Sequence, residues 1–204
     1  CPEPFVLACP PEAMPEGEPV CHTDYVDNYN AGCNSSPPTF SNPYGGGTGN
    51  IDCVAGTVQV CGTYGTYFNQ GFLYRDTDWY QVVAHGPTHL RYCAVGEAAT
   101  TLFFIHGTAG CGGLNVLCSS SGGPGDSLCC DLTVGAGTYW LFVAPSDFAG
   151  VPCGARYVIS VTQDSCPAPF RVKCPPNARL EGEPVCSDAY VDQTNGGCNS
   201  NPPV

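Results

Sequence analysis

The sequence predicts an all-β fold, a disulfide-rich and jelly-roll-like β-sandwich, in tandem repeats with a period of 165 residues. Three observations predict this class. Sixteen cysteines supply a disulfide framework, while 26 glycines and 20 prolines disfavour helix interiors and favour turns. Short strand-like runs recur along the chain, and no stretch has helical periodicity over a useful length. Many short strands joined by Gly-rich turns are typical of a sandwich or jelly roll.

The predicted strands begin after a long entry segment. Residues 1–20 are Pro-rich and acidic and should be extended, and residues 34–50 are turn and linker material. The strand-like runs that follow are 57–62, 66–69, 77–84, 89–95, 100–106, 114–118, 128–134, 138–144 and 156–162. In the last run Tyr157, Ile159 and Val161 are two residues apart, so they share one face of the strand.

The cysteines predict disulfides rather than zinc ligands, because no C-x-x-C pair occurs in the sequence. Disulfides persist in oxidising surroundings, so we expect an extracellular or cell-surface protein. Residues 1–165 hold twelve cysteines, an even number that fits six bridges. The predicted disulfide cysteines are Cys1, Cys9, Cys21, Cys33, Cys53, Cys61, Cys93, Cys111, Cys118, Cys129, Cys130, Cys153, Cys166, Cys174, Cys186 and Cys198.

Connectivity does not follow from sequence alone. Cys21–Cys33 is one candidate pair, because both residues flank a polar loop in each copy of the repeat. Cys111–Cys118 is another, because it could staple a hairpin. The adjacent Cys129 and Cys130 should belong to two separate bridges, because neighbouring strand residues point to opposite faces.

The repeat is visible as near-identity between residues 1–39 and residues 166–204. About 24 of the 39 aligned positions are identical without a gap, and all four cysteines of the first segment have counterparts. Residues 1–165 therefore form one repeat, with an entry segment and linker in 1–50 and a sandwich body in 51–165. Residues 166–204 open the next repeat. Two interpretations of residues 166–204 follow. Either the second repeat is cut at an arbitrary point, or this segment docks on the repeat before it.

The net charge of −12, with only six Lys and Arg, excludes nucleic acid and anionic membranes as expected partners. No apolar run approaches the roughly 18 residues of a membrane helix, so no membrane insertion is expected. The sequence opens on Cys1 without a signal peptide, as expected of a mature or interior fragment.

Three motifs resemble the bacterial pre-peptidase C-terminal domain, a calcium-binding β-sandwich also seen as the collagen-binding domain of secreted collagenases. They are the acidic entry Glu16–Pro19, the strand Asp76–Tyr80, and the late hairpin Gly135–Val143 with Tyr157–Val161. The resemblance covers residues 16–162. It implies that the acidic entry and the D-x-D strand converge on calcium. The family's entry usually continues E-P-N, whereas Val20 and Cys21 follow here, so one expected side-chain ligand is missing.

The residue chemistry also favours calcium, which takes six to eight oxygen ligands. Glu16, Glu18 and Asp27 recur in the second copy, whereas Asp24 does not and ranks lower. Asp76 and Asp78 should lie on one face of a strand. Carboxylates held together repel, and a divalent ion removes that repulsion. The candidate calcium ligands are Glu16, Glu18, Asp27, Asp76, Asp78, Glu181, Glu183 and Asp192.

No catalytic motif emerges, and we expect no enzyme. Gly125–Leu128 spells the G-D-S-L of one hydrolase class, but it follows a Gly/Pro-rich turn, and no His lies in a D-x-x-H pattern. The four His show no metal-ligand spacing. Asn34 begins a glycosylation sequon and is a candidate glycan acceptor.

Two functions remain. The first is a structural subunit of an extracellular fibre, stalk or surface layer, with neighbouring copies of the repeat as head-to-tail partners. The alternative is a calcium-dependent collagen- or carbohydrate-binding appendage of a secreted enzyme, which the 11% aromatic content would serve. The number of repeats in the whole protein would separate them.

Overall fold

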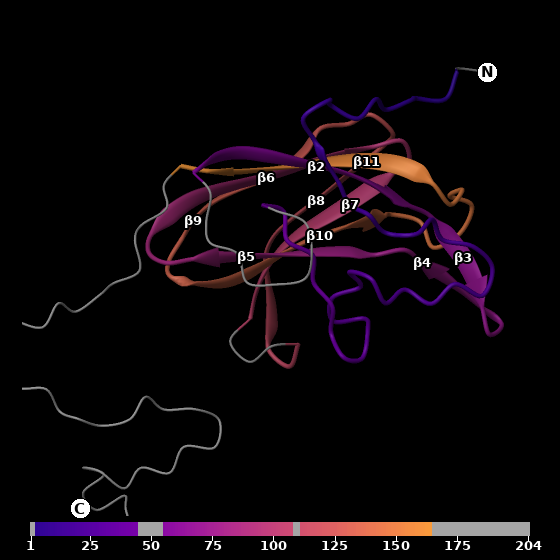
Figure 1. The fold of residues 1–204 in the computed structure, drawn as a ribbon, viewed down its shortest axis with the longest axis horizontal. Helices are drawn as coiled ribbons and strands as arrows, with labels where there is room; N and C mark the ends of the chain where they lie inside the picture. The colour runs from indigo at the N-terminus through magenta and orange to yellow at the C-terminus, as the bar shows by residue number, and fades with distance from the viewer. Residues whose placement is uncertain (1–2, 45–54, 108–110, 165–204) are drawn as a thin grey trace, which may run out of the picture. The chain divides into compact units, whose positions relative to one another are not determined.

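The computed structural model describes residues 3–44, 55–107 and 111–164, and within these ranges every regular element is a β-strand (Figure 1). We call residues 3–44 the opening segment and residues 55–164 the body. The strands are β1 (Met14–Pro15), β2 (Gly56–Tyr64), β3 (Thr66–Asn69), β4 (Phe72–Arg75), β5 (Asp78–Ala84), β6 (Thr88–Gly96), β7 (Thr100–Gly107), β8 (Leu114–Gly122), β9 (Leu128–Val134), β10 (Gly137–Pro145) and β11 (Ala155–Gln163).

Two sheets form the sandwich. One has the order β1-β2-β11-β6-β9 and the other the order β5-β10-β7-β8, while β3 and β4 make a separate hairpin. All pairings in these sheets are antiparallel except that of β1 with β2, which is parallel. The predicted all-β sandwich is thus confirmed. Every predicted strand run has its counterpart, whereas β1, of two residues, and β4, of four residues, were not predicted.

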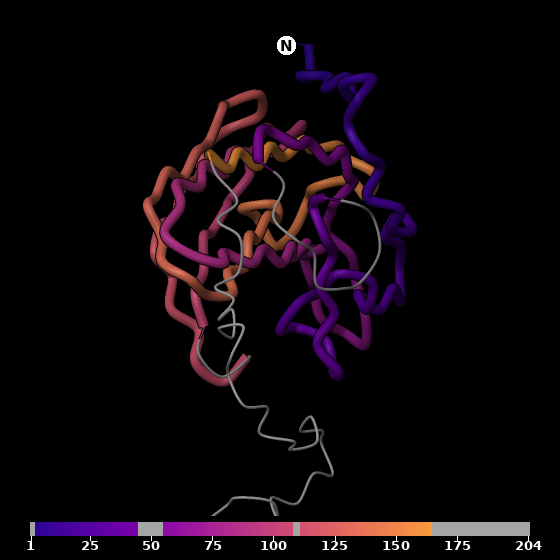
Figure 2. Tube along the Cα trace, turned by 60° about the vertical axis from the view of Figure 1, so that its left-hand side comes forward, coloured from indigo at the N-terminus to yellow at the C-terminus, as the bar shows by residue number. Residues whose placement is uncertain are grey.

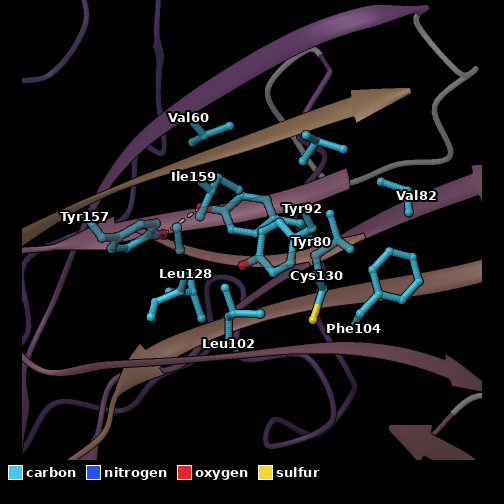
Figure 3. Packing of buried hydrophobic residues seen from close by; sticks show 14 of the residues in the cluster. Val60, Tyr80, Val82, Tyr92, Leu102, Phe104, Leu128, Cys130, Tyr157 and Ile159 are labelled. Carbon is cyan, nitrogen blue, oxygen red and sulfur yellow. Dashed lines mark hydrogen bonds between the residues drawn. The ribbon is translucent and has the colours of Figure 1, made fainter. Parts of the chain in front are cut away.

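The main core fills the space between the two sheets. Tyr157 and Ile159, which the alternation placed on one face of the last strand, are both fully buried there. Figure 3 shows Val60 and Ile159 from one sheet together with Tyr80, Val82 and other side chains from the other. Side chains alternate between the two faces of each strand, so every second residue points into the core.

The opening segment lies along one side of the sandwich in Figure 2. Its β1 forms the edge of the first sheet, and its end, with Cys33 and Phe40, packs on the outer face of the second sheet. Phe40 stacks on Trp140 at 5.6 Å between ring centroids and meets Trp79 edge-on at 6.3 Å. Gly32 lies so close to the indole of Trp79 that a Cβ on it would come within 2.1 Å of Trp79 Cγ. The opening segment is thus an integral layer of the domain rather than an external linker.

Five disulfides join the described residues: Cys9–Cys61, Cys21–Cys153, Cys33–Cys111, Cys93–Cys129 and Cys118–Cys130. The adjacent Cys129 and Cys130 belong to two bridges, as expected. Three of the five bridges tie the opening segment to the body. The predicted cysteines Cys1, Cys53, Cys166, Cys174, Cys186 and Cys198 lie outside the described residues.

Both candidate pairs are wrong. Cys21 and Cys33 face different parts of the body, so each pairs there and not with the other. Cys118 lies on β8 and pairs with Cys130 on β9, which belongs to the opposite sheet. Cys111 instead reaches Cys33. A hairpin staple would have needed both cysteines on the same side of the sheet.

The five bridges require oxidising surroundings, so the protein belongs outside the cytoplasm. Among the residues that the structure describes, no helix is long and apolar enough to cross a membrane.

Candidate metal centre

Five of the predicted ligands converge at the contact between the opening segment and the body. Glu16, Glu18 and Asp78 bring one oxygen each to within 4.8 Å of one another, and Glu18, Asp27 and Asp76 do the same. The two groups share Glu18. The predicted convergence of the acidic entry with the D-x-D segment is therefore present in the fold, although the two stretches are far apart in sequence.

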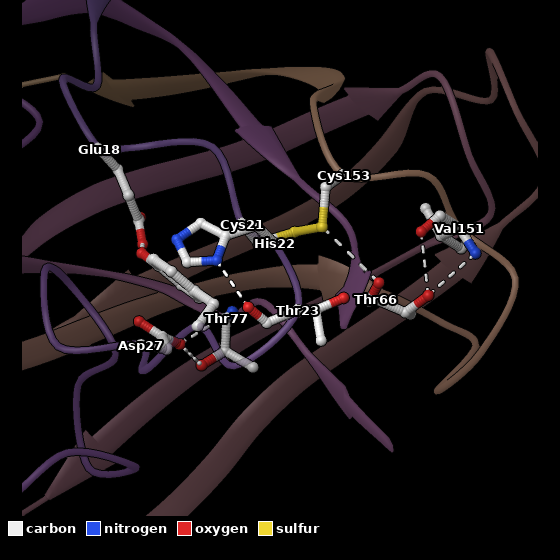
Figure 4. Close-up of a disulfide and its surroundings, with 10 residues drawn as sticks. Glu18, Cys21, His22, Thr23, Asp27, Thr66, Thr77, Val151 and Cys153 are labelled. Atoms are coloured by element: carbon white, nitrogen blue, oxygen red, sulfur yellow. Dashed lines mark hydrogen bonds between the residues drawn. A yellow bond between two sulfur atoms is a disulfide. The ribbon is translucent and has the colours of Figure 1, made fainter. Parts of the chain in front are cut away.

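Local backbone contacts bring the two stretches together. Strand β1 runs parallel to β2, and the amide of Glu16 donates to the carbonyl of Cys61 at 2.9 Å. The Cys21–Cys153 disulfide then fixes the chain beyond Glu18 (Figure 4). On the body, the amide of Asp76 donates to the carbonyl of Gly65 at 2.9 Å.

Asp76 and Asp78 differ from the prediction in one respect. Strand β5 begins at Asp78, so Asp76 lies in the connection before it rather than on the strand. Both are nevertheless buried, at 1% and 0% exposure. The intervening Thr77 is held by Asp27, whose Oδ2 accepts from the Thr77 amide at 3.3 Å and from its hydroxyl at 3.1 Å.

The cluster contains buried oxygen atoms that no protein group satisfies. They are Glu18 Oε2, Asp27 Oδ1, Asn30 Oδ1, Asp76 Oδ1 and both carboxylate oxygens of Asp78. Buried polar atoms in folded proteins almost always have a hydrogen-bond partner, so such a concentration needs an explanation. Five of these oxygens belong to carboxylates of the two converging groups, and carboxylate oxygens are the ligands that calcium prefers.

Protein donors hold the other carboxylate oxygen of Glu18 and of Asp27. Tyr25 donates its hydroxyl to Glu18 Oε1 at 2.5 Å, which leaves Oε2 for a ligand. Asp27 likewise offers Oδ1 while Oδ2 is bound by Thr77. The protein thus orients the carboxylates of Glu18 and Asp27, and preorganised ligands lose little conformational freedom on binding.

Glu16 is the most heavily anchored member. Its Oε1 accepts from Asn30 Nδ2 at 2.7 Å, from the Tyr80 hydroxyl at 3.0 Å and from the Tyr157 hydroxyl. Its Oε2 accepts from the amide of Thr63 at 3.1 Å. These donors place a carboxylate opposite the unpartnered oxygens of Asp78.

Burial and the proximity of like charges dominate the electrostatics of the cluster. Burial raises the pKa of Asp76 to about 9, that of Glu18 to about 7 and that of Asp27 to about 6. Burial also raises the pKa of Asp78 well above its usual range. Neighbouring carboxylates push all four pKa values further upward, because like charges disfavour ionisation. A cation at the cluster would reverse these shifts.

Asn30 is a candidate ligand that sequence reasoning missed. Its side chain is fully buried beside Glu16, and its Oδ1 has no partner. It supplies an uncharged amide oxygen next to the carboxylates. One sequence signal could have found it: Asn30 recurs as Asn195, just as Glu16, Glu18 and Asp27 recur.

Other predicted residues fall outside the cluster. Asp24 is exposed, consistent with its lower rank. Asp126 accepts from the amide of Gly123 at 2.8 Å within a turn, as expected for the G-D-S-L stretch. Asn34 is exposed and donates to the Thr77 hydroxyl at 3.0 Å, so glycosylation there remains a prediction. The second-copy ligands Glu181, Glu183 and Asp192 lie outside the described residues.

No family model and no curated protein matches the sequence. Among solved structures, PliG of Aeromonas hydrophila, a periplasmic inhibitor of g-type lysozyme, is 14% identical, with a TM-score of 0.41 over 56% of this chain and 93% of that one. The pre-peptidase C-terminal domain of a Bacillus anthracis collagenase is also 14% identical, with a TM-score of 0.35 over 56% and 99%. PirA is 11% identical, with a TM-score of 0.27 over 43% and 92%. All three likenesses concern the fold alone.

Proposed function

We propose that this chain is part of a structural subunit of an extracellular fibre, stalk or surface layer, built from tandem β-sandwich repeats that calcium and disulfides stabilise. The buried carboxylate cluster carries this proposal. It joins the opening segment, through Glu16, Glu18, Asp27 and Asn30, to the body, through Asp76 and Asp78. Three disulfides join the same two parts.

Calcium fits the cluster better than other common metals. Every candidate ligand atom is a carboxylate or amide oxygen, whereas zinc and copper sites typically include His nitrogen or Cys sulfur. Magnesium keeps several waters and seldom takes an all-protein cage, while calcium accepts six or more protein oxygens. Calcium would supply charge to carboxylates that otherwise repel one another, and it would fasten two layers of one domain. On this proposal calcium stabilises the fold and takes no part in catalysis.

The calcium part is tested by titrating the exhaustively chelated protein and following thermal unfolding. A ligand that binds only the native state at 100 times its Kd stabilises by about 3 kcal/mol, or about 5–10 °C in Tm for a domain of this size. Magnesium at equal concentration is the control and should act more weakly. An unchanged Tm after calcium addition would refute the site.

The fibre part needs a protein that carries several repeats. Electron microscopy should show stiff rods in calcium and bent or collapsed chains after chelation. Rods that are equally stiff in calcium and after chelation would show that the fibre does not depend on calcium. Freely jointed beads in both would contradict the structural role itself.

One observation favours the alternative of a binding appendage. The β3–β4 hairpin exposes Phe68, Phe72 and Leu73 at 48%, 67% and 54%. Beside it lies a groove of about 530 Å³ that Phe148, Tyr74 and several amide side chains line. Aromatic rings next to amides suit saccharides or an extended peptide. Immobilised collagen and glycan arrays test this, with Phe148→Ala, which removes an aromatic ring of the groove, as the variant that should abolish any retention.

A further inference from the structure

We infer that the outer edge of strand β8 pairs with the same strand of a second copy of this chain, antiparallel and across a two-fold axis. Strand β8 is the last strand of the second sheet, and it pairs with β7 on one side. Among the described residues, no strand pairs with its other side. The inference goes beyond the proposed function, because it joins separate chains through a strand that contributes nothing to the carboxylate cluster.

The opening segment covers the sheet edges on the opposite side of the sandwich (Figure 2). Strand β1 lies along β2 and, with two residues, is too short to recruit a further strand. Beside β5, the amide of Ser41 donates to the carbonyl of Trp79 at 2.9 Å, and the carbonyl of Ser41 accepts from the amide of Gln81 at 2.8 Å. Uncovered edge strands invite pairing with other chains, so folded proteins usually cover them or place charges on them.

The remaining two edges of the large sheets, β9 and β8, differ in charge. Strand β9 exposes Asp131, whose carboxylate contacts His89 of the neighbouring β6. Strand β8 carries no charged residue, and neither do the turns beside it, since residues 107–125 contain no Asp, Glu, Lys or Arg. Within the described parts of the two large sheets, β8 is therefore the edge that has neither a cover nor a charge.

The lack of charge on this edge favours a second copy as the partner. The chain has a net charge of −12, so most contacts between two copies would bring carboxylates together, whereas a contact through β8 would not. A basic partner would find no carboxylate to bind there. A strand edge is also its own complement, because the unpaired amides and carbonyls of one antiparallel strand match those of another. Two identical edges related by a two-fold axis run antiparallel and meet this condition.

The exposed side chains of β8 indicate where the two strands overlap. Leu114, Val116 and Leu117 are exposed in its first half, whereas residues 119–121 in its second half are serines. A register shift leaves Leu117 without a partner residue on β7. An overlap centred on Val116 places the apolar half of one strand against the apolar half of the other. It removes these side chains from water while the backbones add a strand to each sheet.

Sedimentation velocity of residues 1–204 tests the pairing. The mass should rise from 21.3 kDa toward twice that value as the protein concentration increases. A single species of 21.3 kDa at every concentration would overturn the inference. Open-ended growth beyond two chains would overturn it as well, because a two-fold pair leaves no β8 edge for a third chain.

Val116→Lys is the variant that identifies the surface. Val116 is 52% exposed, so the lysine should leave the fold intact, which unchanged tryptophan fluorescence would verify. In the pair the two lysines would face each other at the centre of the overlap, so the dissociation constant should rise at least about tenfold.

Phe72→Lys is the matched control. Phe72 is 67% exposed on the β3–β4 hairpin, and its replacement should leave the dissociation constant unchanged. Dimers that survive Val116→Lys, or that only Phe72→Lys disrupts, would show that another surface joins the chains, and the inference would fail.

Amide hydrogen exchange distinguishes strand pairing from contact between apolar side chains. Between low and high protein concentration, amides of β8 should become more protected, because pairing gives them new backbone hydrogen bonds. Amides of β5, beside which Ser41 already lies, should not change. A dimer without added protection in residues 114–118 would overturn the inference, and this measurement needs no variant.

Discussion

Replacing Asp76 by Asn should make the calcium-free domain more stable and the calcium-bound domain less stable. Asp76 is 1% exposed, and its Oδ1 has no hydrogen-bond partner. The burial that raises its pKa to about 9 means that the folded, calcium-free domain holds this carboxyl protonated at pH 7. The unfolded chain ionises it near the ordinary value of 3.8.

The difference between the folded and unfolded pKa values of Asp76 sets the expected change in stability. Binding that proton at pH 7 costs about 1.4 kcal/mol for each of the roughly three pH units above 3.8, or about 4 kcal/mol. At pH 5 the same reasoning gives about 2 kcal/mol. Asn has no proton to bind, so Asp76→Asn should raise calcium-free stability by up to these amounts. It also removes a charged ligand, so calcium affinity should fall at least about tenfold, equivalent to about 1.4 kcal/mol.

Urea unfolding at pH 5 and pH 7, with calcium or with chelator, measures both effects. Trp79 and Trp140 are buried, and the amide of Trp79 donates to the carbonyl of Asn30 at 2.8 Å, so tryptophan fluorescence reports on the cluster. Asp24→Asn is the matched control, because Asp24 is exposed and its φ of 62° suits Asn. The reasoning is refuted if Asp76→Asn lowers calcium-free stability at pH 7, or if calcium stabilises the variant as much as the parent.

Three further predictions concern other parts of the domain. Gly32→Ala should destabilise by about 2 kcal/mol or more, because of its positive φ and the approach of Trp79, and a change under about 0.5 kcal/mol in urea unfolding would contradict this. Replacing both cysteines of Cys21–Cys153 by Ala should cost about 3–5 kcal/mol and weaken calcium binding, since the bridge spans 132 positions and anchors the chain beside Glu18. The same change at Cys93–Cys129 should leave calcium affinity intact, and equal weakening in both would argue against the anchor. The stabilisation by calcium should grow from pH 5 to pH 9. The raised carboxyl pKa values contribute fully to the stability of the calcium-free fold below about pH 4, and this contribution is lost as pH rises through about 6 to 9. A calcium-induced rise in Tm that is the same at every pH would contradict this prediction.

The sequence by itself determined most of the strands and most of the candidate metal ligands. A strand needs only a local period of two and turn residues at its ends, and both are written in consecutive residues. Glu16, Glu18 and Asp27 stood out because they recur in the second copy, and Asp76 and Asp78 because of the D-x-D spacing. The recurrence of Asn30 was equally visible, but an asparagine carries no charge to draw notice.

Only the tertiary structure decided which cysteines pair and on which body the opening segment lies. The pairs Cys9–Cys61, Cys21–Cys153 and Cys33–Cys111 are separated by 52, 132 and 78 positions, and no local pattern encodes such distances. They meet because the opening segment forms an outer layer on sheets assembled from residues far away in the chain. A disulfide needs Cα atoms about 5–6 Å apart, a condition that depends on how the layers stack. The neighbouring cysteines Cys21 and Cys33, close in sequence, face different parts of that stack.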